Sequence, residues 1–240
     1  MNNRTDTFSL LTPRPAICLH RRPNTNENSP HLKVTFGQKT FDSEGEEGSR
    51  CFFSRAVHWP GGASGVTIGR GYDMGQRTRL QVERELVHAG LDVGDAQYLS
   101  MAAGLRGGSA ERFVRENQRT APVLPLSVQK NLFETITSVE TIADLKRIMT
   151  KPDLVERYGA TDWEAFPLSI QELVFDLRYR GDYTPETRSR LQPLIVRSDV
   201  RGLYDLMSDH GYWSSIGVPD GRIKARIGLL ENAFETATAA

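Results

Sequence analysis

Residues 41–77 read FDSEGEEGSRCFFSRAVHWPGGASGVTIGRGYDMGQR. The stretch is polar, rich in glycine and aromatic residues, and poor in ordinary core residues for its length. Loops and short strands expose their side chains while the rest of a domain holds them in place, so such segments often carry a functional site. We therefore expect this stretch to decide both the fold and the chemistry.

The central part of the stretch, residues 65–72, is predicted to be an extended strand. Side chains alternate between two faces along a strand. One face would carry Thr67 and Asp73, with Gly69 and Gly71 between them. Two positions without side chains leave an open floor for a bulky substrate. In the alternative interpretation, the two glycines mark a bulge or a sharp bend of the sheet.

Acid–base chemistry at this strand needs a carboxylate upstream of it. Glu44, Glu46 and Glu47 each qualify, and Asp42 is a fourth candidate. Aspartates near glycine often serve only to shape turns. A solvated acidic turn without catalytic function is the alternative interpretation of the whole group.

The segments before this stretch have a different character. Residues 1–31 are rich in Pro, Asn, Arg and Thr, so they bury little apolar surface and are predicted to form a flexible arm. Residues 32–41 alternate apolar and polar positions, which predicts a small hairpin with Gly37 in its turn.

The segments after it are predicted to be helical. Apolar residues recur at helical spacing from Thr78, and Gly90 is expected to end this first helix. Thr141-x-x-Asp144 resembles a capping box and predicts the start of a separate helix. The further helices are expected at about 94–104, 108–118, 126–138, 141–150, 168–180, 184–194, 199–209 and 221–236.

This order of elements predicts an α+β fold in which a small β lobe near the N-terminus packs on a larger multi-helix lobe. We expect one domain, residues 32–240, after the flexible arm. No internal repeat is visible in the sequence.

Composition excludes several classes of function. Thirty basic and 30 acidic residues give no net charge, which argues against a strongly electrostatic nucleic-acid binder. No run approaches the roughly 18 to 20 apolar residues of a membrane span. Cys18 and Cys51 are too few for a disulfide framework and are expected to be unpaired. Without an HExxH motif or a Cys/His cluster, no metal or cofactor is predicted.

The central motif resembles that of the pesticin-like muramidases, which are related to phage-type lysozymes. The family's pattern is a Glu-Gly pair followed by Ser-Gly-Val-Thr-Ile-Gly-x-Gly-[Phe/Tyr]-Asp, and this chain has Glu44-Gly45 and then SGVTIGRGYDMGQ at 64–76. The resemblance implies a lysozyme-like fold and a catalytic group of Glu44, Thr67 and Asp73. The glutamate of phage lysozymes lies on a helix, whereas a strand is predicted before Glu44 here.

In such enzymes two carboxyl groups divide the work of glycoside hydrolysis. The resemblance implies that Glu44 is the general acid, that Asp73 orients water or stabilises positive charge, and that Thr67 helps to hold that water. It also implies inversion, with carboxyl groups roughly 6.5–9.5 Å apart. A weaker resemblance to the helical lobe of these enzymes covers Gln171, Asp176, Tyr179, Arg222 and Arg226.

Neighbouring residues are candidates for substrate binding. Trp59 and Tyr72 are expected either to stack on sugar rings or to belong to the core. Arg55 and Arg70 are candidates for contacts with muramyl or peptide carboxylates. Gln76, the last residue of the motif, is a further candidate for substrate binding.

Several functions remain open at this point. The leading hypothesis is a muramidase that cleaves peptidoglycan between N-acetylmuramic acid and N-acetylglucosamine. The alternatives are another glycosidase such as a chitinase, a lytic transglycosylase, and a catalytically inactive module that binds glycan or protein.

The sequence also suggests where such an enzyme would act. The N-terminus lacks the features of a secretory signal. Effector-like muramidases are similar to this chain, which implies synthesis in the cytoplasm, delivery by secretion machinery and action in the periplasm of a target cell. An antibacterial toxin of this kind would require a cognate immunity protein.

Overall fold

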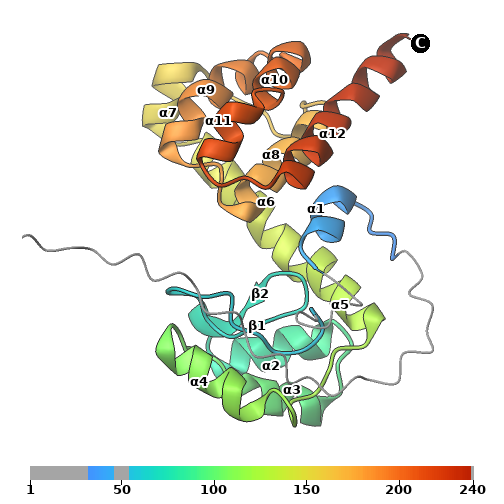
Figure 1. The fold of residues 1–240 in the computed structure, drawn as a ribbon, viewed down its shortest axis with the longest axis vertical. Coiled ribbons are helices and arrows are strands. Elements are labelled where there is room, and N and C mark those ends of the chain that lie inside the picture. The colour runs from blue at the N-terminus through green and yellow to red at the C-terminus, as the bar shows by residue number, and fades with distance from the viewer. Residues whose placement is uncertain (1–31, 46–53, 239–240) are drawn as a thin grey trace, which may run out of the picture.

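The computed structural model describes residues 32–45 and 54–238 of the chain. Its elements form two lobes that are joined by a long helix, as Figure 1 shows. The hairpin lobe (residues 54–117) contains β1 (Thr67–Ile68), β2 (Tyr72–Asp73), the short 3-10 helix η1 (Met74–Gln76), α2 (Arg79–His88), α3 (Val93–Ser100) and α4 (Gly108–Asn117).

The connecting helix and the second lobe complete the described chain. The connecting helix comprises α5 (Leu126–Leu132), the π-helical segment η2 (Phe133–Thr137) and α6 (Ser138–Met149). The helical lobe (residues 152–238) contains α7 (Pro152–Tyr158), α8 (Leu168–Arg180), α9 (Pro185–Val196), α10 (Val200–Met207), α11 (His210–Ser215) and α12 (Asp220–Thr238). The helix α1 (Gln38–Ser43) precedes both lobes in the sequence and packs on the helical lobe.

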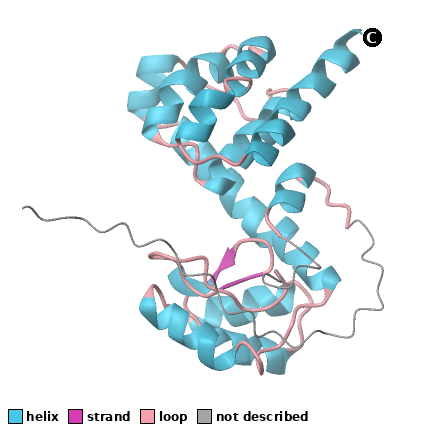
Figure 2. Cartoon of the chain, viewed as in Figure 1, coloured by secondary structure: helices cyan, strands magenta, loops and turns pink. Residues whose placement is uncertain are grey.

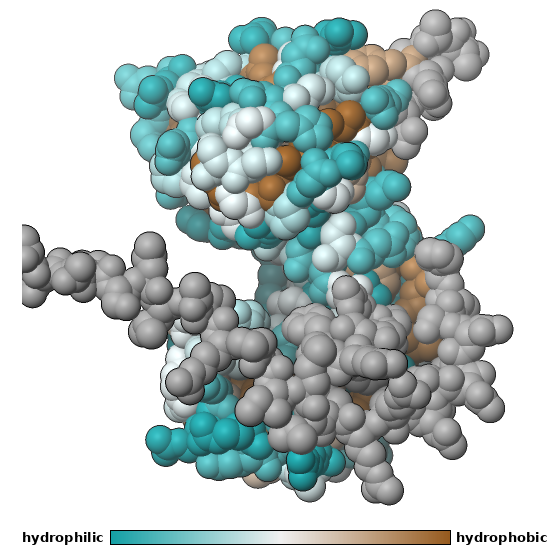
Figure 3. All heavy atoms as spheres, in the orientation of Figure 1, coloured by the Kyte–Doolittle hydropathy of each residue, from teal (hydrophilic) through white to brown (hydrophobic). Residues whose placement is uncertain are grey.

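Each lobe has its own hydrophobic core. Tyr72, Met74 and Leu86 are among the buried residues of the hairpin lobe, and Phe175 and Trp213 are among those of the helical lobe. The connecting helix contributes to both cores, since residues of α5 pack in the first and residues of α6 in the second. On the face that Figure 3 shows, the helical lobe is mostly hydrophilic, with scattered apolar patches.

The central strand prediction is wrong in one respect. Residues 65–73 form an antiparallel hairpin and not one extended strand, with Thr67 opposite Asp73 and Ile68 opposite Tyr72. Gly69 and Gly71 have φ angles of 62° and 91°, a left-handed region in which glycine is favoured. The sharp-bend interpretation of the two glycines is therefore confirmed, and it is compatible with the open floor. In the described part of the chain, this hairpin is where strands are seen (Figure 2).

The predicted hairpin at 32–41 is also wrong, because residues 38–43 are helical. Gly37, at a φ of 73°, lies just before α1, and its carbonyl accepts a hydrogen bond of 2.9 Å from the Phe41 N–H. The apolar residues that suggested a strand instead pack edge-on against aromatic rings of α8 and of the connecting helix. Phe36 contacts Phe175 and Phe41 contacts Phe133, each with a centroid distance of 5.1 Å.

Most helix predictions are confirmed, and the helix at 168–180 has the predicted bounds. The first helix ends before Gly90, which has a φ of 100°. The predicted break before Thr141 is wrong. Its hydroxyl donates to the Thr137 carbonyl within a continuous helix, so it caps nothing. The short helices α7 and α11 were not predicted.

The observed class agrees with the predicted α+β class, since a small antiparallel sheet accompanies many helices. The lobe that holds the sheet is itself mostly helical, unlike the predicted β lobe. Within residues 32–45 and 54–238, no helix has the length and apolar character needed to cross a membrane.

Candidate functional site

A cavity of about 400 Å³ lies between the hairpin, the connecting helix and the end of α8. The hairpin contributes Gly71 and Asp73 to its wall, α6 contributes Glu140 and Asp144, and α8 contributes Tyr179. The cavity therefore lies where the two lobes meet. It is lined by polar and charged side chains, as a site for a hydrated ligand requires.

Asp73 ends β2 with its side chain at this cavity. Its Oδ1 accepts a hydrogen bond of 2.6 Å from the Gly75 N–H, and its Oδ2 accepts one of 3.2 Å from the Gly65 N–H. Gly65 and Gly75 approach so closely that a Cβ on Gly65 would lie 2.4 Å from the Gly75 backbone. The two glycines thus let backbone donors reach both carboxylate oxygens, which fixes the orientation of Asp73.

Thr67 lies on β1, directly opposite Asp73 of β2. It is buried, and its hydroxyl is oriented towards the Gly65 carbonyl at 3.4 Å. Its backbone exchanges two hydrogen bonds with His58, of 2.8 and 2.9 Å. Thr67 therefore connects the hairpin to the preceding segment, next to the candidate carboxylate.

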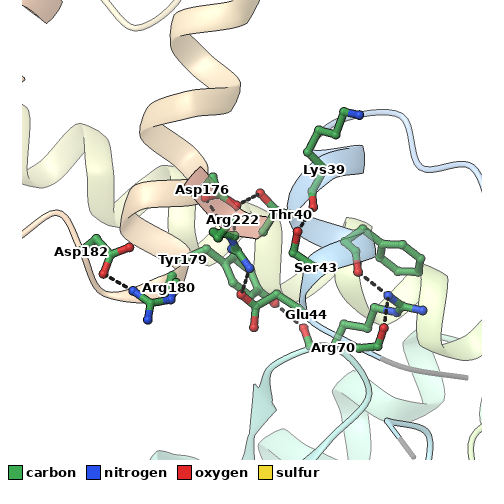
Figure 4. Close-up of polar contacts among 12 residues, drawn as sticks. Lys39, Thr40, Ser43, Glu44, Arg70, Asp176, Tyr179, Arg180, Asp182 and Arg222 are labelled. Carbon is green, nitrogen blue, oxygen red and sulfur yellow. Dashed lines mark hydrogen bonds and ion pairs between the residues drawn. The ribbon is translucent and has the colours of Figure 1, made fainter. Parts of the chain in front are cut away.

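Glu44 caps the C-terminal end of α1 and is half-buried. Its Oε1 forms an ion pair of 2.8 Å with Arg222 Nη1 of α12 (Figure 4). Glu44 is not among the residues that line the cavity. Tyr179, which does line it, lies near Glu44 (Figure 4). Burial raises the pKa of the Tyr179 hydroxyl above its usual range, and the nearby charge of Glu44 raises it further.

The prediction that a strand precedes Glu44 is wrong, because residues 38–43 form the helix α1. Glu46, Glu47, Cys18 and Cys51 fall outside the described residues, as does the predicted arm 1–31.

A buried network of charges lies behind Glu44. Asp176 Oδ2 accepts hydrogen bonds from Arg222 Nε at 2.9 Å and Arg226 Nε at 2.7 Å. Arg226 also pairs with Asp182 at 2.6 Å, and Asp182 pairs with Arg180. Burial acts to raise the pKa of Asp176, but hydrogen bonds and charges from the two arginines outweigh it and hold the pKa below its usual range.

The charges on the cavity wall are also arranged in pairs. Arg77 pairs with Glu140, and Arg178 Nε donates to Asp144 Oδ2 at 2.6 Å. Arg77 Nη1 donates to the backbone carbonyl of Asp73 at 2.6 Å. These pairs connect the hairpin and α8 to the connecting helix, so they help to set the width of the cavity.

Arg70 and Tyr72 have contacts other than those predicted. Arg70 is buried and donates to the carbonyls of Phe41 and Gly45, with its guanidinium 4.1 Å from the Phe41 ring. It thereby ties the hairpin turn to α1. Tyr72 has no exposed surface, and its hydroxyl donates to Glu85 at 2.6 Å. A ring inside the core cannot stack on a sugar, so of the two interpretations of Tyr72 the structure supports the position in the core.

The other predicted binding residues lie outside the cavity wall. Trp59 is half-buried, and its Nε1 donates to the Ser64 carbonyl at 3.2 Å. Gln76 is exposed at the end of η1. Arg55 Nη1 donates to the Leu124 carbonyl at 2.9 Å.

Sequence reasoning missed Thr40, Arg77, Arg180 and Asp182. A helical interpretation of residues 38–44 would have placed Thr40 and Glu44 four positions apart on one face, which was the available signal. The ion pairs join positions far apart in the sequence and had no local signal. Among the described residues, no group of three His, Cys, Asp or Glu side chains is arranged to hold a metal ion.

No curated protein matches this chain. One family does match, and its description is "Domain of unknown function (DUF8812)". The match covers residues 37–227, so it includes the hairpin, the cavity, Glu44 and the buried charge network. The chain belongs to this family of domains of unknown function.

Proposed function

We propose that this chain is a peptidoglycan hydrolase with a lysozyme-like fold, and that it cleaves the β-1,4 bond between N-acetylmuramic acid and N-acetylglucosamine. The observation that carries the proposal is the position of two carboxylates near the junction of the lobes. Asp73 lines the cavity, and Glu44, which is not part of the cavity wall, lies near Tyr179 of the α8 wall (Figure 4).

Hydrolysis of a glycosidic bond requires two carboxyl groups with different tasks. In the proposed mechanism Glu44 donates its proton to the leaving oxygen as the glycosidic bond breaks. Asp73 orients a water molecule and accepts its proton while the water oxygen bonds to the anomeric carbon. Thr67, opposite Asp73 in the hairpin, would help to hold this water.

The environments of the two carboxylates suit these tasks. Backbone N–H groups hold Asp73 through both oxygens, so little reorganisation is needed when it engages water. Glu44 is half-buried and held by Arg222, which restricts its position next to a substrate in the cavity. Fixed catalytic groups lower the entropic part of the barrier.

The arrangement of the lobes also supports this function. A long helix joins the lobes, and the cavity opens where hairpin, connecting helix and α8 meet. A glycan strand is a long polymer, and a site between two lobes gives it a path across the molecule.

Digestion of purified peptidoglycan, followed by mass analysis of the soluble fragments, tests the proposal. Wild type is expected to release muropeptides with reducing N-acetylmuramic acid ends, and Glu44→Gln and Asp73→Asn are expected to release none. Glu111→Gln and Asp153→Asn are the matched controls, since both residues are exposed in other helices. They should digest at the wild-type rate.

The other hypotheses predict different products. Anhydro ends that persist in Asp73→Asn would identify a lytic transglycosylase. Faster cleavage of chitin oligosaccharides than of peptidoglycan would identify another glycosidase. Binding to peptidoglycan without any fragments would identify an inactive glycan-binding module.

We further propose, from the resemblance to effector-like muramidases, that the enzyme acts as an antibacterial toxin in the periplasm of a target cell after delivery by secretion machinery. A cognate immunity protein would then cover the cavity. Expression of the chain with and without an added periplasmic signal peptide tests this idea. Lysis should require both the signal peptide and Glu44.

A further inference from the structure

Glu44 belongs to a closed ring of hydrogen bonds and ion pairs (Figure 4). Thr40 Oγ1 donates to Asp176 Oδ1 at 2.8 Å, and Arg222 Nη2 contacts the same oxygen at 2.6 Å. Arg222 Nη1 pairs with Glu44 Oε1 at 2.8 Å. The Glu44 N–H donates to the Thr40 carbonyl at 3.0 Å, which closes the ring through one turn of α1.

Helical spacing produces this ring. Thr40 and Glu44 are four residues apart, so they project from the same face at the end of α1. Arg222 and Arg226 are likewise four residues apart on α12. Asp176 of α8 lies between the two pairs and is 2% exposed. A carboxylate that is so deeply buried must be matched by donors and positive charge, and the two arginines and the threonine supply them.

The helix α1 depends on such contacts for its position. It has six residues, which is too short for stability in isolation. Its N-terminal side is held by the Gly37 N–H, which donates to Glu172 at 3.2 Å, and by the Thr35 N–H, which donates to Glu134 at 2.6 Å. In the middle of the helix, the Thr40 hydroxyl donates to Asp176 and fixes the register of α1 against α8.

We propose that Thr40 and Asp176 are positioning residues that fix the Glu44 carboxylate for proton donation; this inference rests on the proposed hydrolase function. Asp176 contacts Nε and Nη2 of Arg222 and so fixes the orientation of the guanidinium. Its remaining nitrogen, Nη1, is thereby held in place to pair with Glu44. Thr40 ties the backbone turn that carries Glu44 to the same aspartate. Loss of either contact lets α1 shift relative to Arg222.

The decisive variant is Thr40→Val, which removes the hydroxyl and keeps a branched side chain of the same size. Misplacement of a proton donor slows the chemical step more than it weakens substrate binding. We expect kcat to fall on the order of tenfold with KM unchanged. Hydrogen exchange of the α1 amides, measured without substrate, should become faster because the helix has lost an anchor.

Two controls separate positioning from general damage. Thr40→Ser keeps the hydroxyl and should restore kcat to within about twofold of wild type. Thr135→Val is the matched replacement at an exposed threonine whose hydroxyl donates to the carbonyl of its own helix at Asn131. This variant should keep wild-type kcat and wild-type exchange in α1.

The role of Asp176 is tested by combination. If Thr40 and Asp176 act through one ring, Asp176→Asn combined with Thr40→Val should lower kcat by less than the product of the two single effects. A melting curve for each variant confirms that it is folded at the assay temperature. Should Asp176→Asn not fold, the Thr40 series alone decides the proposal.

The outcomes are distinguishable. Wild-type kcat and wild-type exchange in Thr40→Val would overturn the inference, and so would a raised KM with unchanged kcat. Independent, multiplicative effects of Thr40 and Asp176 would overturn their joint role. If wild type releases no fragments, the hydrolase function is refuted, and with it the catalytic role of Thr40 and Asp176. Hydrogen exchange of the α1 amides would still decide whether Thr40 anchors α1.

Discussion

Thr67 and Asp73 lie directly opposite each other across the β1–β2 hairpin. The three-residue turn between the strands reverses the chain, so two polar residues from one sequence motif meet at the same end of the hairpin. Gly71 allows this turn to approach α8, because a Cβ there would lie 2.6 Å from the Tyr179 hydroxyl. The geometry around Asp73 therefore depends on a glycine that carries no chemistry itself.

Gly71→Ala is expected to lower both stability and activity. Gly71 has a φ of 91°, where alanine is strained, and the added methyl group would collide with Tyr179. We expect the free energy of unfolding to fall by about 1–3 kcal/mol and peptidoglycan digestion to slow, because the hairpin that carries Asp73 must shift. Urea denaturation and a turbidity assay measure the two effects.

Gly61→Ala is the matched control for this prediction. Gly61 has a φ of 108°, but a Cβ there would meet no atom within 4 Å. It should show the backbone strain alone, on the order of 1 kcal/mol, with digestion unchanged. Equal loss of digestion in both variants would mean that the approach of Tyr179 to the turn is unimportant.

The sequence located the motif at 64–76 and predicted most helices because their signals are local, although it did not predict that the motif folds as a hairpin. Helical periodicity and terminal glycines gave the helix at 168–180 and the stop at Gly90. Local signals predicted the wrong element where tertiary contacts determine the backbone conformation. Phe36 and Phe41 alternate as in a strand, yet Phe36 packs on a ring of α8 and Phe41 on a ring of the connecting helix. The chain between them forms the start of α1.

The residues of the candidate site likewise divide into those with a local sequence signal and those whose contacts depend on tertiary packing. The motif at 64–76 located Asp73 and Thr67, and the resemblance named Asp176 and Arg222 without indicating what they contact. That Arg222 joins Asp176 to Glu44 follows from the packing of α12 against α8 and α1, which no local pattern encodes. The two interpretations of Tyr72 stayed open because its position in the motif gives no information on its burial.

Removal of one partner from the buried charge network is expected to destabilise the helical lobe strongly. Arg226 is 1% exposed and pairs with Asp176 and Asp182. Arg226→Met would leave these buried carboxylates without a common partner, so we expect a loss of about 3–5 kcal/mol in the free energy of unfolding. Urea denaturation at neutral pH measures it.

Lys224→Met is the control on the same helix. Lys224 pairs with Asp220 at 2.7 Å, but both side chains are exposed to solvent, where an ion pair contributes little. Its unfolding midpoint should match that of wild type. A comparable loss in both variants would contradict the importance assigned to burial.

The lowered pKa of Asp176 predicts acid sensitivity. Its folded pKa is below the unfolded value of about 3.9, so its contribution to stability is complete above that value and is lost as the pH falls through the folded pKa. Asp144, whose pKa Arg147 and Arg178 lower against the effect of burial, acts in the same direction. The free energy of unfolding should therefore fall below about pH 4.

The carboxylate responsible can be identified by substitution. Asp176→Asn should be less stable than wild type at neutral pH, and its stability should fall less steeply below about pH 4, because one titrating group is gone. Burial raises the pKa of Glu172, so its contribution to stability changes at a higher pH than that of Asp176. It is complete below the unfolded pKa of Glu172 and is lost as the pH rises through the folded pKa. An identical acid slope in wild type and Asp176→Asn would show that other groups cause the sensitivity.

Two tyrosines should separate stability from activity. The Tyr72 hydroxyl donates to the charged Glu85 inside the hairpin lobe, whereas the Tyr179 hydroxyl donates to the Arg70 carbonyl at the cavity. Tyr72→Phe should cost about 1.5–3 kcal/mol of stability, and Tyr179→Phe about 1 kcal/mol. The loss of activity should be larger in Tyr179→Phe than in Tyr72→Phe. Of the two hydroxyls, that of Tyr179 is the one that donates to the hairpin turn, which directly precedes the strand of Asp73.

The measurement is a comparison of unfolding midpoints with rates of peptidoglycan digestion, at a temperature where both variants are fully folded. We expect Tyr72→Phe to digest at nearly the wild-type rate and Tyr179→Phe to digest several-fold more slowly. A larger loss of activity in Tyr72→Phe would favour the original expectation of sugar stacking. It would also require the hairpin lobe to open during catalysis, since Tyr72 has no exposed surface in the structure.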